Sequence, residues 1–474
     1  MSGSQAPTGP LAVFDLGKTN SKLFVFSTEG AMLDERRTKP VWRPHKGRSV
    51  LDDQLLFDWM GRELADVVAR HGVTGLIVSA HGCTFALVRG TGHQLHPVLD
   101  YEQEIPDRLA AEIDPLLPEF SETYVPYLTL GFCMARHIYW LQRDEPEAFA
   151  EADAILCYPQ YWGWRFTGRQ VGEYSYIGAH TQMWAPLARD YSSLVGRLGW
   201  RGKLPEIVPA GAVIGQTPVR LANGEERSVA VHNGVHDSNA ALAYYRMTGL
   251  DDFTIVSTGT WVIIINLACP LEALDRERDM LSNVTVKGEP APSLRFMGGR
   301  EYDRISENWN ESISRSAVEA VIARGVFVLP SWAPDGPFPE IVGEIVGGEV
   351  EGEERAAAAA LYVVMMTDLS LDLIRSENKI VVDGGLARIG LYTAMLAQLR
   401  PAQAVLRSSM SEGSATGAAA LAFQALGLSP FRDETVAVAA ESIAGLETYR
   451  DKWRELANAA RSKARQATGR GQGT

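Results

Sequence analysis

Cysteine and histidine are scarce in this sequence, and neither is grouped. The 474 residues include four cysteines and nine histidines. No C-x-x-C pair and no H-E-x-x-H motif occurs, so neither a disulfide scaffold nor a common zinc site is indicated. Isolated cysteines of this kind are typical of reduced, buried thiols. We expect this of all four, which are Cys83, Cys133, Cys157 and Cys269.

Positive charge is also in short supply. The chain has 45 lysine and arginine residues against 58 acidic ones, which gives a net charge of -13. A general nucleic-acid-binding protein needs a basic surface to neutralise phosphates, so we expect no nucleic-acid partner. Small anionic ligands remain compatible with this composition, because backbone amides and a metal ion can hold them locally.

Long hydrophobic runs and a targeting segment are missing as well. The apolar run at residues 261–265 is far shorter than the roughly 20 residues of a membrane-spanning helix. The opening MSGSQAPTGP has neither the charged nor the apolar region of a signal peptide. We therefore expect a soluble cytoplasmic protein with no membrane partner, and a disordered leader at residues 1–10.

The sequence does contain a strand–turn–strand unit that occurs twice. The first has strands at residues 11–14 and 23–26 around a turn at 17–20, and the second has strands at 254–256 and 262–265 around a turn at 257–260. β-branched and aromatic residues dominate the strands. Gly17 and Gly259 have the same place in the two turns, about half the chain apart. The repeat, in a chain too long for one ordinary core, predicts two related domains.

Between and after these units the pattern alternates between strands and helices, as in an α/β protein. The glycine-rich acidic segment 343–354 is typical of a surface loop, and the basic tail from residue 461 is expected to fray. Strands are predicted at residues 75–79, 97–99 and 380–382, and helices at 57–70, 131–143, 238–245, 356–374 and 391–399.

Gly17-Lys18-Thr19 resembles the end of a P-loop, G-x-x-x-x-G-K-[ST]. The first glycine of that motif would fall at Ala12, however, and a P-loop must open a helix whose N-terminus faces the phosphates. Here the turn opens a predicted strand. A P-loop phosphotransferase that uses Lys18 is therefore disfavoured.

The alternative is a hairpin turn that lies against phosphates. Glycine allows close backbone approach, and turn amides can form an anion-binding nest. Thr19 and Thr260 add hydroxyl groups, and Asp15 at the end of the first strand could hold Mg²⁺ through water. Two ordinary hairpin turns remain the competing interpretation.

These residues resemble the motifs of the FGGY family of carbohydrate kinases, over about residues 11–423. The segment from Asp15 to Lys22, DLGKTNSK, is similar to the family's first phosphate motif, D-x-G-T-T-S-x-R, and departs from it at Lys18, Asn20 and Lys22. Gly259-Thr260 matches the second phosphate motif. Gly234-Val235-His236-Asp237 matches the segment that carries the catalytic aspartate.

Three further segments support the resemblance. Asp383-Gly384-Gly385 is similar to the adenine-side motif, although Ile389-Gly390 stands where the family usually has an asparagine. Glu412 and the GAAA run at 417–420 resemble the closing E-x-x-x-x-G-A-A helix. Residues 161–168, YWGWRFTG, look like the family's strand that leads into L-T-G, with Phe166 in place of leucine.

The resemblance implies two ribonuclease H-like (actin-like ATPase) domains with an active-site cleft between them. We expect a sugar-binding domain at residues 11–246, a nucleotide-binding domain at 252–460, and disorder at 1–10 and 461–474. The implied nucleotide-binding residues are Gly17, Lys18, Thr19, Asn20, Gly259, Thr260, Gly384 and Gly385, with Asp15 as the metal residue for Mg²⁺.

The resemblance also implies roles in the transfer itself. Asp237 would be the general base that takes the proton of the sugar hydroxyl; the competing interpretation is a helix N-cap. His81, Gly82, Asp100, Tyr101, Glu102 and His236 would face the sugar, against the alternatives of a satisfied buried histidine and a solvated charge pair. His236 adjoins Asp237 and would either orient it or touch the sugar. Core packing is the expected role of Trp162, Trp164 and Trp184.

The function implied is transfer of the γ-phosphate of ATP, with Mg²⁺, to a hydroxyl of a ketose (pentulose or deoxyhexulose) or a related polyol. The alternative is a non-catalytic, ATP-driven binding or regulatory protein on the actin-like fold, although no DNA-reading segment is evident. The sequence leaves open which small-molecule sugar is used, whether the protein is a homodimer, and what Gly298-Gly299-Arg300-Glu301 does.

Overall fold

The computed structural model describes residues 9–410, 412–432 and 434–467. The chain divides into two compact units. Unit 1 comprises Met1–Leu250, Ser282–Pro290 and Glu412–Asp433, and unit 2 comprises Asp251–Leu281, Ala291–Ser411 and Glu434–Thr474. The sequence predicts two contiguous domains, but the structure also assigns Ser282–Pro290 and Glu412–Asp433 to unit 1. The second of these segments contains helix α14, which packs on the sheet of unit 1.

A mixed sheet forms the centre of unit 1. Its strands are β1 (Leu11–Leu16), β2 (Ser21–Phe26), β3 (Met32–Thr38), β6 (Gly75–Ala80), β12 (Val213–Arg220), β13 (Glu226–His232) and β14 (Val235–His236). β1, β2 and β3 form an antiparallel meander. β6 pairs in parallel with β1, β13 and β14. β12 closes the order β12-β13-β6-β1-β2-β3. The first predicted hairpin is confirmed.

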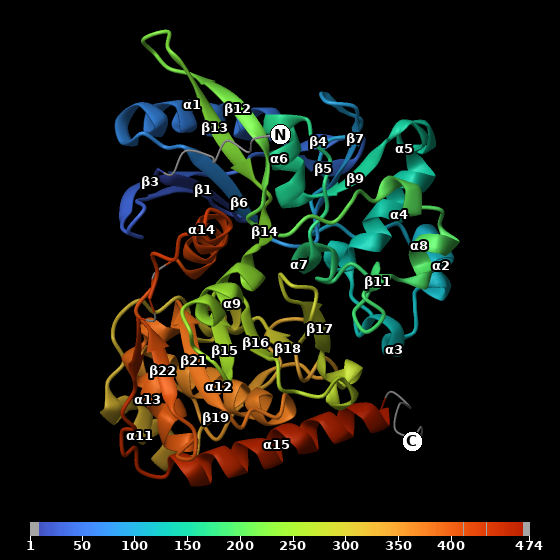
Figure 1. Cartoon of the computed structure of the whole chain (residues 1–474). Helices are drawn as coiled ribbons and strands as arrows, with labels where there is room; N and C mark the ends of the chain where they lie inside the picture. Colours follow the sequence, from blue (N-terminus) through green and yellow to red (C-terminus); the bar gives the residue numbers. More distant parts are fainter. Residues whose placement is uncertain (1–8, 411, 433, 468–474) are drawn as a thin grey trace. The chain divides into compact units, whose positions relative to one another are not determined.

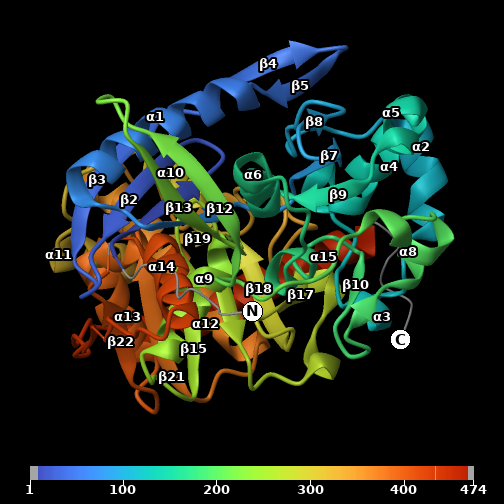
Figure 2. The same cartoon turned by 45° about the horizontal axis from the view of Figure 1, so that its top comes forward.

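Helix α14 (Gly413–Ala425) packs on this sheet although it is far from it in sequence. Figures 1 and 2 both show the red helix beside the green helix α9 (Asp237–Met247) and the blue strands. An added Cβ at Gly417 would lie 2.0 Å from the carbonyl oxygen of Ala240, so the two helices touch at a position that only glycine fits. The small residues of α14 cover a core that includes Leu11, Val13 and Phe24.

The other elements of unit 1 surround this centre. The helices are α1 (Asp53–His71), α2 (Asp107–Ile113), α3 (Phe120–Thr123), α4 (Met134–Asp144), α5 (Pro146–Glu151), α6 (Tyr158–Thr167), α7 (Tyr174–Ile177) and α8 (Ser193–Arg197). The short 3₁₀ turns are η1 (Asp114–Leu116), η2 (Leu130–Phe132) and η3 (Arg201–Lys203). Smaller sheets are formed by β4 (Trp42–His45) with β5 (Arg48–Leu51), by β8 (His93–Gln94), β7 (Phe85–Arg89) and β9 (Ala154–Cys157), and by β10 (Trp184–Ala185) with β11 (Asp190–Tyr191).

Unit 2 repeats the same strand plan. Its sheet has the order β17-β18-β16-β15-β21-β22-β23, from β15 (Phe253–Thr258), β16 (Val262–Asn266), β17 (Met280–Val284), β18 (Pro290–Phe296), β21 (Lys379–Gly384), β22 (Val405–Ser408) and β23 (Thr435–Ala437). The boundary between the units falls within β17 and at the first residue of β18, because Ser282–Pro290 is assigned to unit 1. β15 and β16 form the second predicted hairpin, and β21 lies parallel to β15 as β6 does to β1. The repeated glycine turns therefore do mark two related folding units.

Helices and short strands complete unit 2. They are α10 (Gly298–Ile305), α11 (Arg315–Arg324), α12 (Gly352–Leu373), α13 (Gly390–Leu399), α15 (Leu446–Ala467), β19 (Phe327–Leu329), β20 (Glu344–Val346), η4 (Leu271–Ala273), η5 (Arg276–Arg278) and η6 (Leu386–Arg388). Among the described residues, α12 alone is long and apolar enough to cross a membrane, and 89% of its most apolar stretch is buried inside the structure. The expectation that every apolar run is short is thus wrong for α12, which is a core helix.

Several predicted elements need correction. The segment 343–354 is not one loop, because it contains β20 and the first residues of α12. The helix predicted at 131–143 begins at Met134, after the turn η2, and Leu99 makes an isolated bridge to Val50 rather than a strand. The segment 161–168 is not a strand, since Tyr158–Thr167 forms α6.

The C-terminal tail does not fray at residue 461. α15 continues to Ala467, and Arg461 is buried with its guanidinium 3.3 Å from the carboxylate of Glu340. The sequence also predicts disorder at residues 1–10. Residues 1–8 and 468–474 lie outside the described part of the chain, whereas Gly9 is buried and the Pro10 carbonyl accepts from the Thr74 amide at 3.0 Å.

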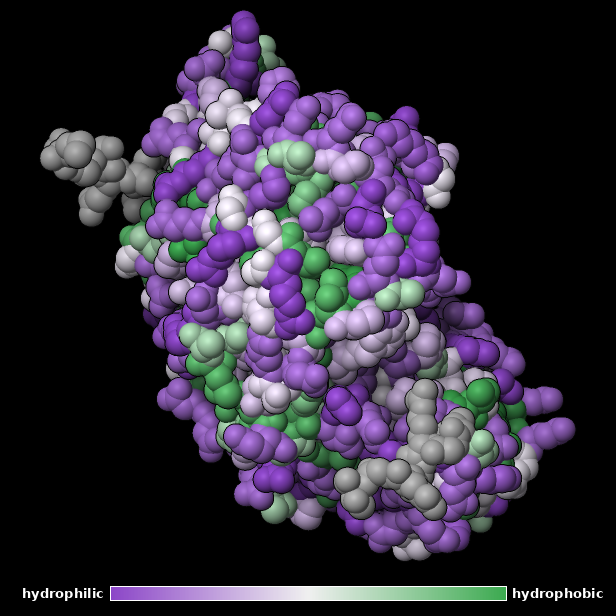
Figure 3. Space-filling view, turned by 90° about the vertical axis from the view of Figure 1, so that its right-hand side faces the viewer, coloured by the Kyte–Doolittle hydropathy of each residue, from purple (hydrophilic) through white to green (hydrophobic). Residues whose placement is uncertain are grey.

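Burial of apolar side chains follows the expected pattern. The four cysteines are buried, reduced thiols, as expected. Trp162, Trp164 and Trp184 are buried too, as predicted for core residues. Figure 3 shows a face on which hydrophilic residues predominate and hydrophobic ones are scattered in small groups. On this face, apolar side chains therefore form only a minor part of the surface.

Candidate functional site

The two glycine turns have closely similar geometry. In unit 1 the amide of Gly17 donates to the carbonyl of Asn20 at 3.0 Å, and in unit 2 the amide of Gly259 donates to the carbonyl of Trp261 at 2.8 Å. Thr19, Asn20, Gly259 and Thr260 are exposed, so a ligand can reach both turns. Strand β2, not a helix, follows the first turn, and the P-loop interpretation is therefore wrong.

Carboxylates gather at the end of β1. The half-buried Asp15 accepts a hydrogen bond from the Ser414 hydroxyl at 3.1 Å. Burial and the nearby Asp237 carboxylate raise the pKa of Asp15 to about 7, while Ser414 and Lys22 lower it. Lys22 donates to both carboxylate oxygens of Glu412, at 2.9 and 2.7 Å. Unit 1 thus brings together the predicted metal residue, the predicted base and the family's closing glutamate.

Asp237 is the first residue of helix α9. The N-cap of this helix is His236, so the interpretation of Asp237 as an N-cap is wrong by one residue. One carboxylate oxygen, Oδ1, accepts from the Ser238 amide at 2.6 Å, and the side chain is 34% exposed. The carboxylate is therefore fixed by its own helix and still open to a ligand.

His81 follows β6 and has an unusual hydrogen-bonding state. Its Nδ1 donates to the carbonyl of Gly82 at 2.9 Å, which leaves Nε2 as an acceptor. That Nε2 is buried and has no hydrogen-bond partner among the described residues. Burial lowers the pKa of His81 to about 4, so the ring is neutral at physiological pH. The rings of Tyr101 and Tyr158 lie 5.2 and 4.9 Å from it, centre to centre.

Lys18 points toward the predicted sugar residues. Its ammonium forms an ion pair with Asp100 and lies 3.7 Å from the ring centre of Trp42 and 5.2 Å from that of Tyr101. Glu102 is exposed. The predicted sugar group thus assembles around His81, Asp100 and Tyr101, joined by Lys18 and by Trp42. Trp42 belongs to none of the sequence motifs, so its position in this group could not be predicted.

The paired glycines of unit 2 lie directly on the second turn. The Gly385 amide donates to the Thr258 carbonyl at 2.7 Å, and the Thr258 hydroxyl donates to the Asp383 carbonyl at 2.5 Å. Gly384 has φ +91°, and an added Cβ would lie 1.9 Å from the Thr258 oxygen. Glycine is therefore required here by both backbone conformation and space.

A pocket of about 360 Å³ opens beside Gly384. Its remaining lining comes from the loop after β21, from the end of β22 with the two residues beyond it, and from β23: Ala387, Arg407, Ser408, Ser409, Met410 and Val436. Sequence reasoning missed Arg407 to Met410. The signal was available, because ligands in α/β sheets bind beyond the carboxyl ends of parallel strands, and β22 is such a strand.

Gly298-Gly299-Arg300-Glu301 is the start of helix α10, not a plain turn. An added Cβ at Gly299 would lie 2.1 Å from the Gly259 carbonyl oxygen, so the helix begins in direct contact with the second turn. Glu301 is buried and accepts hydrogen bonds from the amides of Trp332 and Ala333. The first residues of α10 therefore pack against the second glycine turn and hold it in place.

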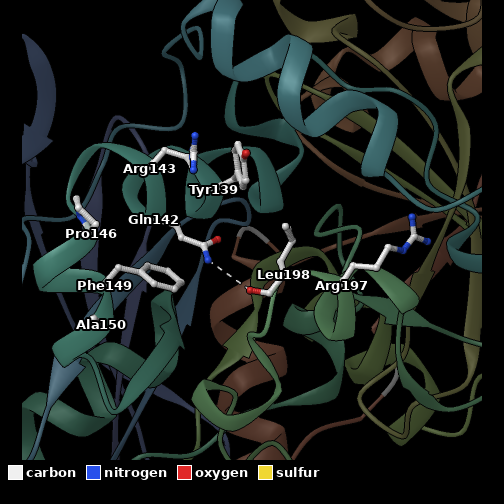
Figure 4. Close-up of a pocket in the computed structure, with 8 residues that line it drawn as sticks. All are labelled: Tyr139, Gln142, Arg143, Pro146, Phe149, Ala150, Arg197 and Leu198. Carbon is white, nitrogen blue, oxygen red and sulfur yellow. Dashed lines mark hydrogen bonds between the residues drawn. The ribbon is translucent and has the colours of Figure 1, made fainter.

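A larger pocket of about 480 Å³ on unit 1 contains none of the predicted residues. Figure 4 shows the side-chain amide of Gln142 in α4, which donates a hydrogen bond to the Leu198 carbonyl at 3.4 Å. The two arginines of the pocket are already engaged: Arg143 lies 3.0 Å from Glu112, and Arg197 donates to the Leu116 carbonyl at 2.8 Å. This pocket is not the candidate site.

Comparisons with known proteins agree with the motifs. The model of the FGGY family of carbohydrate kinases, N-terminal domain, matches residues 11–243, and that of carbohydrate kinase FGGY, C-terminal domain, matches residues 250–430. The crystal structure of a carbohydrate kinase from Novosphingobium aromaticivorans is similar with a TM-score of 0.85 and 34% identity, over 96% of this chain and 99% of that one.

Two characterised relatives are more distant. Glycerol kinase of Alkalilimnicola ehrlichii is 24% identical, over 89% of this chain and 91% of that protein. Xylulose kinase of Escherichia coli is 23% identical, over 86% and 88%.

The fold and the matches define a phosphotransferase built from two actin-like, ribonuclease H-like units. The chain belongs to the FGGY family of carbohydrate kinases. FGGY kinases use ATP and act on small carbohydrate molecules, so the predicted enzyme class is confirmed.

Proposed function

We propose that this kinase transfers the γ-phosphate of ATP to a hydroxyl of a ketose (pentulose or deoxyhexulose) or a related polyol, with Asp237 as the general base. The observation that carries the proposal is the arrangement of Asp237 in unit 1, where an accessible carboxylate lies near Asp15 and His81. Its relatives named glycerol kinase and xylulose kinase support an acceptor that is a polyol or a ketose.

The sugar is held by the group around His81. A neutral Nε2 without a partner among the described residues is suited to accept a hydrogen bond from a sugar hydroxyl. Asp100 offers carboxylate oxygens to further hydroxyls, and Tyr101 supplies an aromatic wall. His236 and Gly82 complete this side, while Glu102, being exposed, contributes at the rim.

Lys18 is predicted from the sequence to bind the nucleotide, and its ion pair with Asp100 supports a different role. An ammonium held on Asp100 and over Trp42 fixes the orientation of that carboxylate toward the sugar. We therefore assign Lys18 to the acceptor side of the reaction.

We assign phosphate binding to the two glycine turns. The exposed residues Thr19, Asn20 and Thr260 offer amide and hydroxyl groups that are suited to phosphate oxygens. Gly17 and Gly259, whose own amides donate within the turns, allow the phosphates to approach the backbone closely. Gly384 and Gly385 allow a nucleoside to approach the backbone beside the pocket of unit 2.

Asp15 fits a magnesium ion. Mg²⁺ takes one or two carboxylates together with water and phosphate oxygens, and no cluster of three or more metal-ligating side chains exists in the described part of the chain. A carboxylate whose pKa is raised by burial and by a second carboxylate gains from a nearby cation. Bound Mg²⁺ would neutralise phosphate charge, and Asp15 would hold it directly or through water.

The chemistry then needs a small number of protein groups. The sugar oxygen forms a new bond to the γ-phosphorus, the bond from that phosphorus to the bridging oxygen of ADP breaks, and the hydroxyl proton passes to the Asp237 carboxylate. A positioned base of this kind contributes about 10²–10⁴-fold. The alternative of a non-catalytic ATP-driven protein is not favoured, because the family and the named relatives are kinases.

The test is ADP release with Mg²⁺-ATP across a panel of ketoses, polyols and aldoses. Asp237→Asn should lose about 10²-fold or more on the sugar that stimulates the wild type. Asp107→Asn is the matched control, because Asp107 is the exposed first residue of helix α2 in the same unit. Turnover that is independent of any sugar, or a fully active Asp237→Asn, would overturn the proposal.

A further inference from the structure

Glu173 is a buried carboxyl with no role in the proposed chemistry. It precedes α7 as its N-cap and accepts from the Ser175 amide at 2.8 Å, the Tyr176 amide at 3.0 Å and the Ser175 hydroxyl at 2.6 Å. Burial raises its pKa to about 7, although these hydrogen bonds lower it. Three donors converge on this one side chain, so the position of Ser175 is closely fixed.

Ser175 connects this carboxyl to the segment that carries the base. Its hydroxyl oxygen accepts from the His236 amide at 3.4 Å, and its carbonyl accepts from the Asn239 side-chain amide, also at 3.4 Å. The same Asn239 nitrogen lies 3.2 Å from His236 Nδ1. Because the Ser175 carbonyl can only accept, it fixes the amide with its NH₂ group toward both partners.

This arrangement determines the tautomer of His236. Nδ1 receives a hydrogen bond from Asn239, so the proton of the neutral ring is on Nε2. Burial lowers the pKa of His236, which keeps the ring neutral. Nε2 lies 3.6 Å from Asp237 Oδ1, and the protonated nitrogen therefore faces the base.

The ring has little freedom to turn. A Cβ added to Gly82 would lie 2.7 Å from His236 Nε2, and the ring of Tyr176 packs edge-on at 5.7 Å between centres. Tyr176 also donates to the carbonyl of His81 at 2.9 Å. The short helix α7 therefore contacts both the His81 and the His236 sides of the candidate site.

We propose that Ser175 and Asn239, anchored by Glu173, are positioning residues that hold His236 as the Nε2–H tautomer and thereby orient the Asp237 carboxylate toward the acceptor hydroxyl. The proposal rests on the proposed role of Asp237. A stability argument alone does not account for Asn239, because its Oδ1 is buried without a partner in the described part of the chain. An unsatisfied buried acceptor is unfavourable, so the Asn239 amide has a cost in stability that its two donated hydrogen bonds must offset.

The kinetic test uses Asn239→Leu and Ser175→Ala. Each should lower kcat by about 10-fold, as expected of a base displaced by a fraction of an ångström, with the sugar and ATP KM within about 2-fold of wild type. Ser192→Ala is the matched control: Ser192 is buried in the same unit and its hydroxyl donates to the Gln182 carbonyl at 2.7 Å. It should reproduce any loss of thermal stability and leave kcat unchanged.

The second measurement detects the tautomer directly in the wild-type protein. The ¹⁵N shifts of histidine-labelled wild-type protein, with the His236 signals assigned by their loss in His236→Gln, should report the Nε2–H tautomer, and Asn239→Leu should shift it toward a mixture. An Nδ1–H tautomer in the wild type, or full kcat in folded Asn239→Leu, would overturn the inference. An inactive Asp237→Asn beside a fully active Asn239→Leu overturns this inference alone, whereas an active Asp237→Asn overturns the proposed function.

Discussion

Replacing His81 tests the sugar side of the proposal most sharply. His81→Phe keeps a planar ring but removes the Nε2 acceptor, whereas the amide oxygen of His81→Gln can take the place of Nε2 without titrating near neutral pH. Leaving a buried sugar hydroxyl without its acceptor costs about 1–3 kcal/mol. Since 1.4 kcal/mol is about a factor of 10, kcat/KM for the sugar should fall by about 5–140-fold in His81→Phe and by less than about 5-fold in His81→Gln.

The pH dependence of activity gives a second, independent test of His81 as a neutral acceptor. Only the neutral ring accepts at Nε2, so activity that depends on His81 is lost as the pH falls through its pKa of about 4, not through the ordinary 6.5. Burial is the main cause; Asp237 opposes the shift, and Lys18 and His236 add to it. The ratio of kcat/KM between wild type and His81→Gln should therefore be flat from about pH 5.5 to 8. Titration of Asp15 affects both proteins and cancels in the ratio.

The assay is coupled ADP release at sugar concentrations well below KM. Thermal unfolding of each variant shows whether it is folded, and ATP KM serves as the internal control. A ratio that falls with a midpoint near pH 6.5 would refute the neutral buried acceptor, and an unchanged kcat/KM in His81→Phe would refute any contact between His81 and the sugar.

Three further perturbations have defined outcomes. Gly299→Ala places a Cβ 2.1 Å from the Gly259 oxygen and should raise ATP KM by about 10-fold with sugar KM unchanged, while Gly196→Ala, whose Cβ meets nothing within 4 Å, should be neutral. Lys18→Met should raise sugar KM by about 10-fold and leave ATP KM nearly unchanged; the reverse pattern would restore Lys18 to the nucleotide. Between about pH 4.5 and 7 the folded protein keeps a proton on Glu173 that the unfolded chain has lost, so the free energy of unfolding should decline as pH rises, by on the order of 3 kcal/mol. Urea unfolding at both ends of this window should show a decline that is larger in the wild type than in Glu173→Gln by about this amount, because Asp15, whose pKa is also raised, contributes equally to both proteins.

The hairpins and the catalytic segment could be predicted because their signals are local. Gly17 and Gly259 each follow a run of strand residues, and a two-strand unit with a tight turn is decided within about 16 residues of sequence. The partners of these turns could not be predicted in the same way. The contact of Lys18 with Trp42 and the placing of Ser414 against Asp15 depend on the packing of segments that are distant in the chain.

Two errors came from overlooking local helix signals. Residues 161–168 resemble a strand segment of the family, but Pro159 at the start of α6 and Gly168 with φ +74° at its end are the signals of helix boundaries. In the acidic segment 343–354, Glu353 and Glu354 belong to α12 and are the favourable first-turn charges of a helix, not the mark of a loop.

The tail was misjudged for a related reason. Its basic, small-residue composition suggested fraying, yet Leu446, Tyr449, Trp453, Ala457 and Arg461 are buried at helical spacing. The buried face of α15 therefore extends to Arg461. Its ion-pair partner, Glu340, is distant in the sequence and could not be predicted from a local pattern.

The placing of α14 in unit 1 has a consequence for synthesis on the ribosome. The sheet of this unit is complete once residue 236 has been made, but the helix that covers Leu11, Val13 and Phe24 ends at Ala425. Through the synthesis of some 180 intervening residues, this face of the nascent domain lacks its permanent cover, and exposed apolar surface of this kind is prone to aggregation. A fragment ending at Leu250 would have the same defect permanently, so adding residues 412–433 as a separate peptide should raise its solubility.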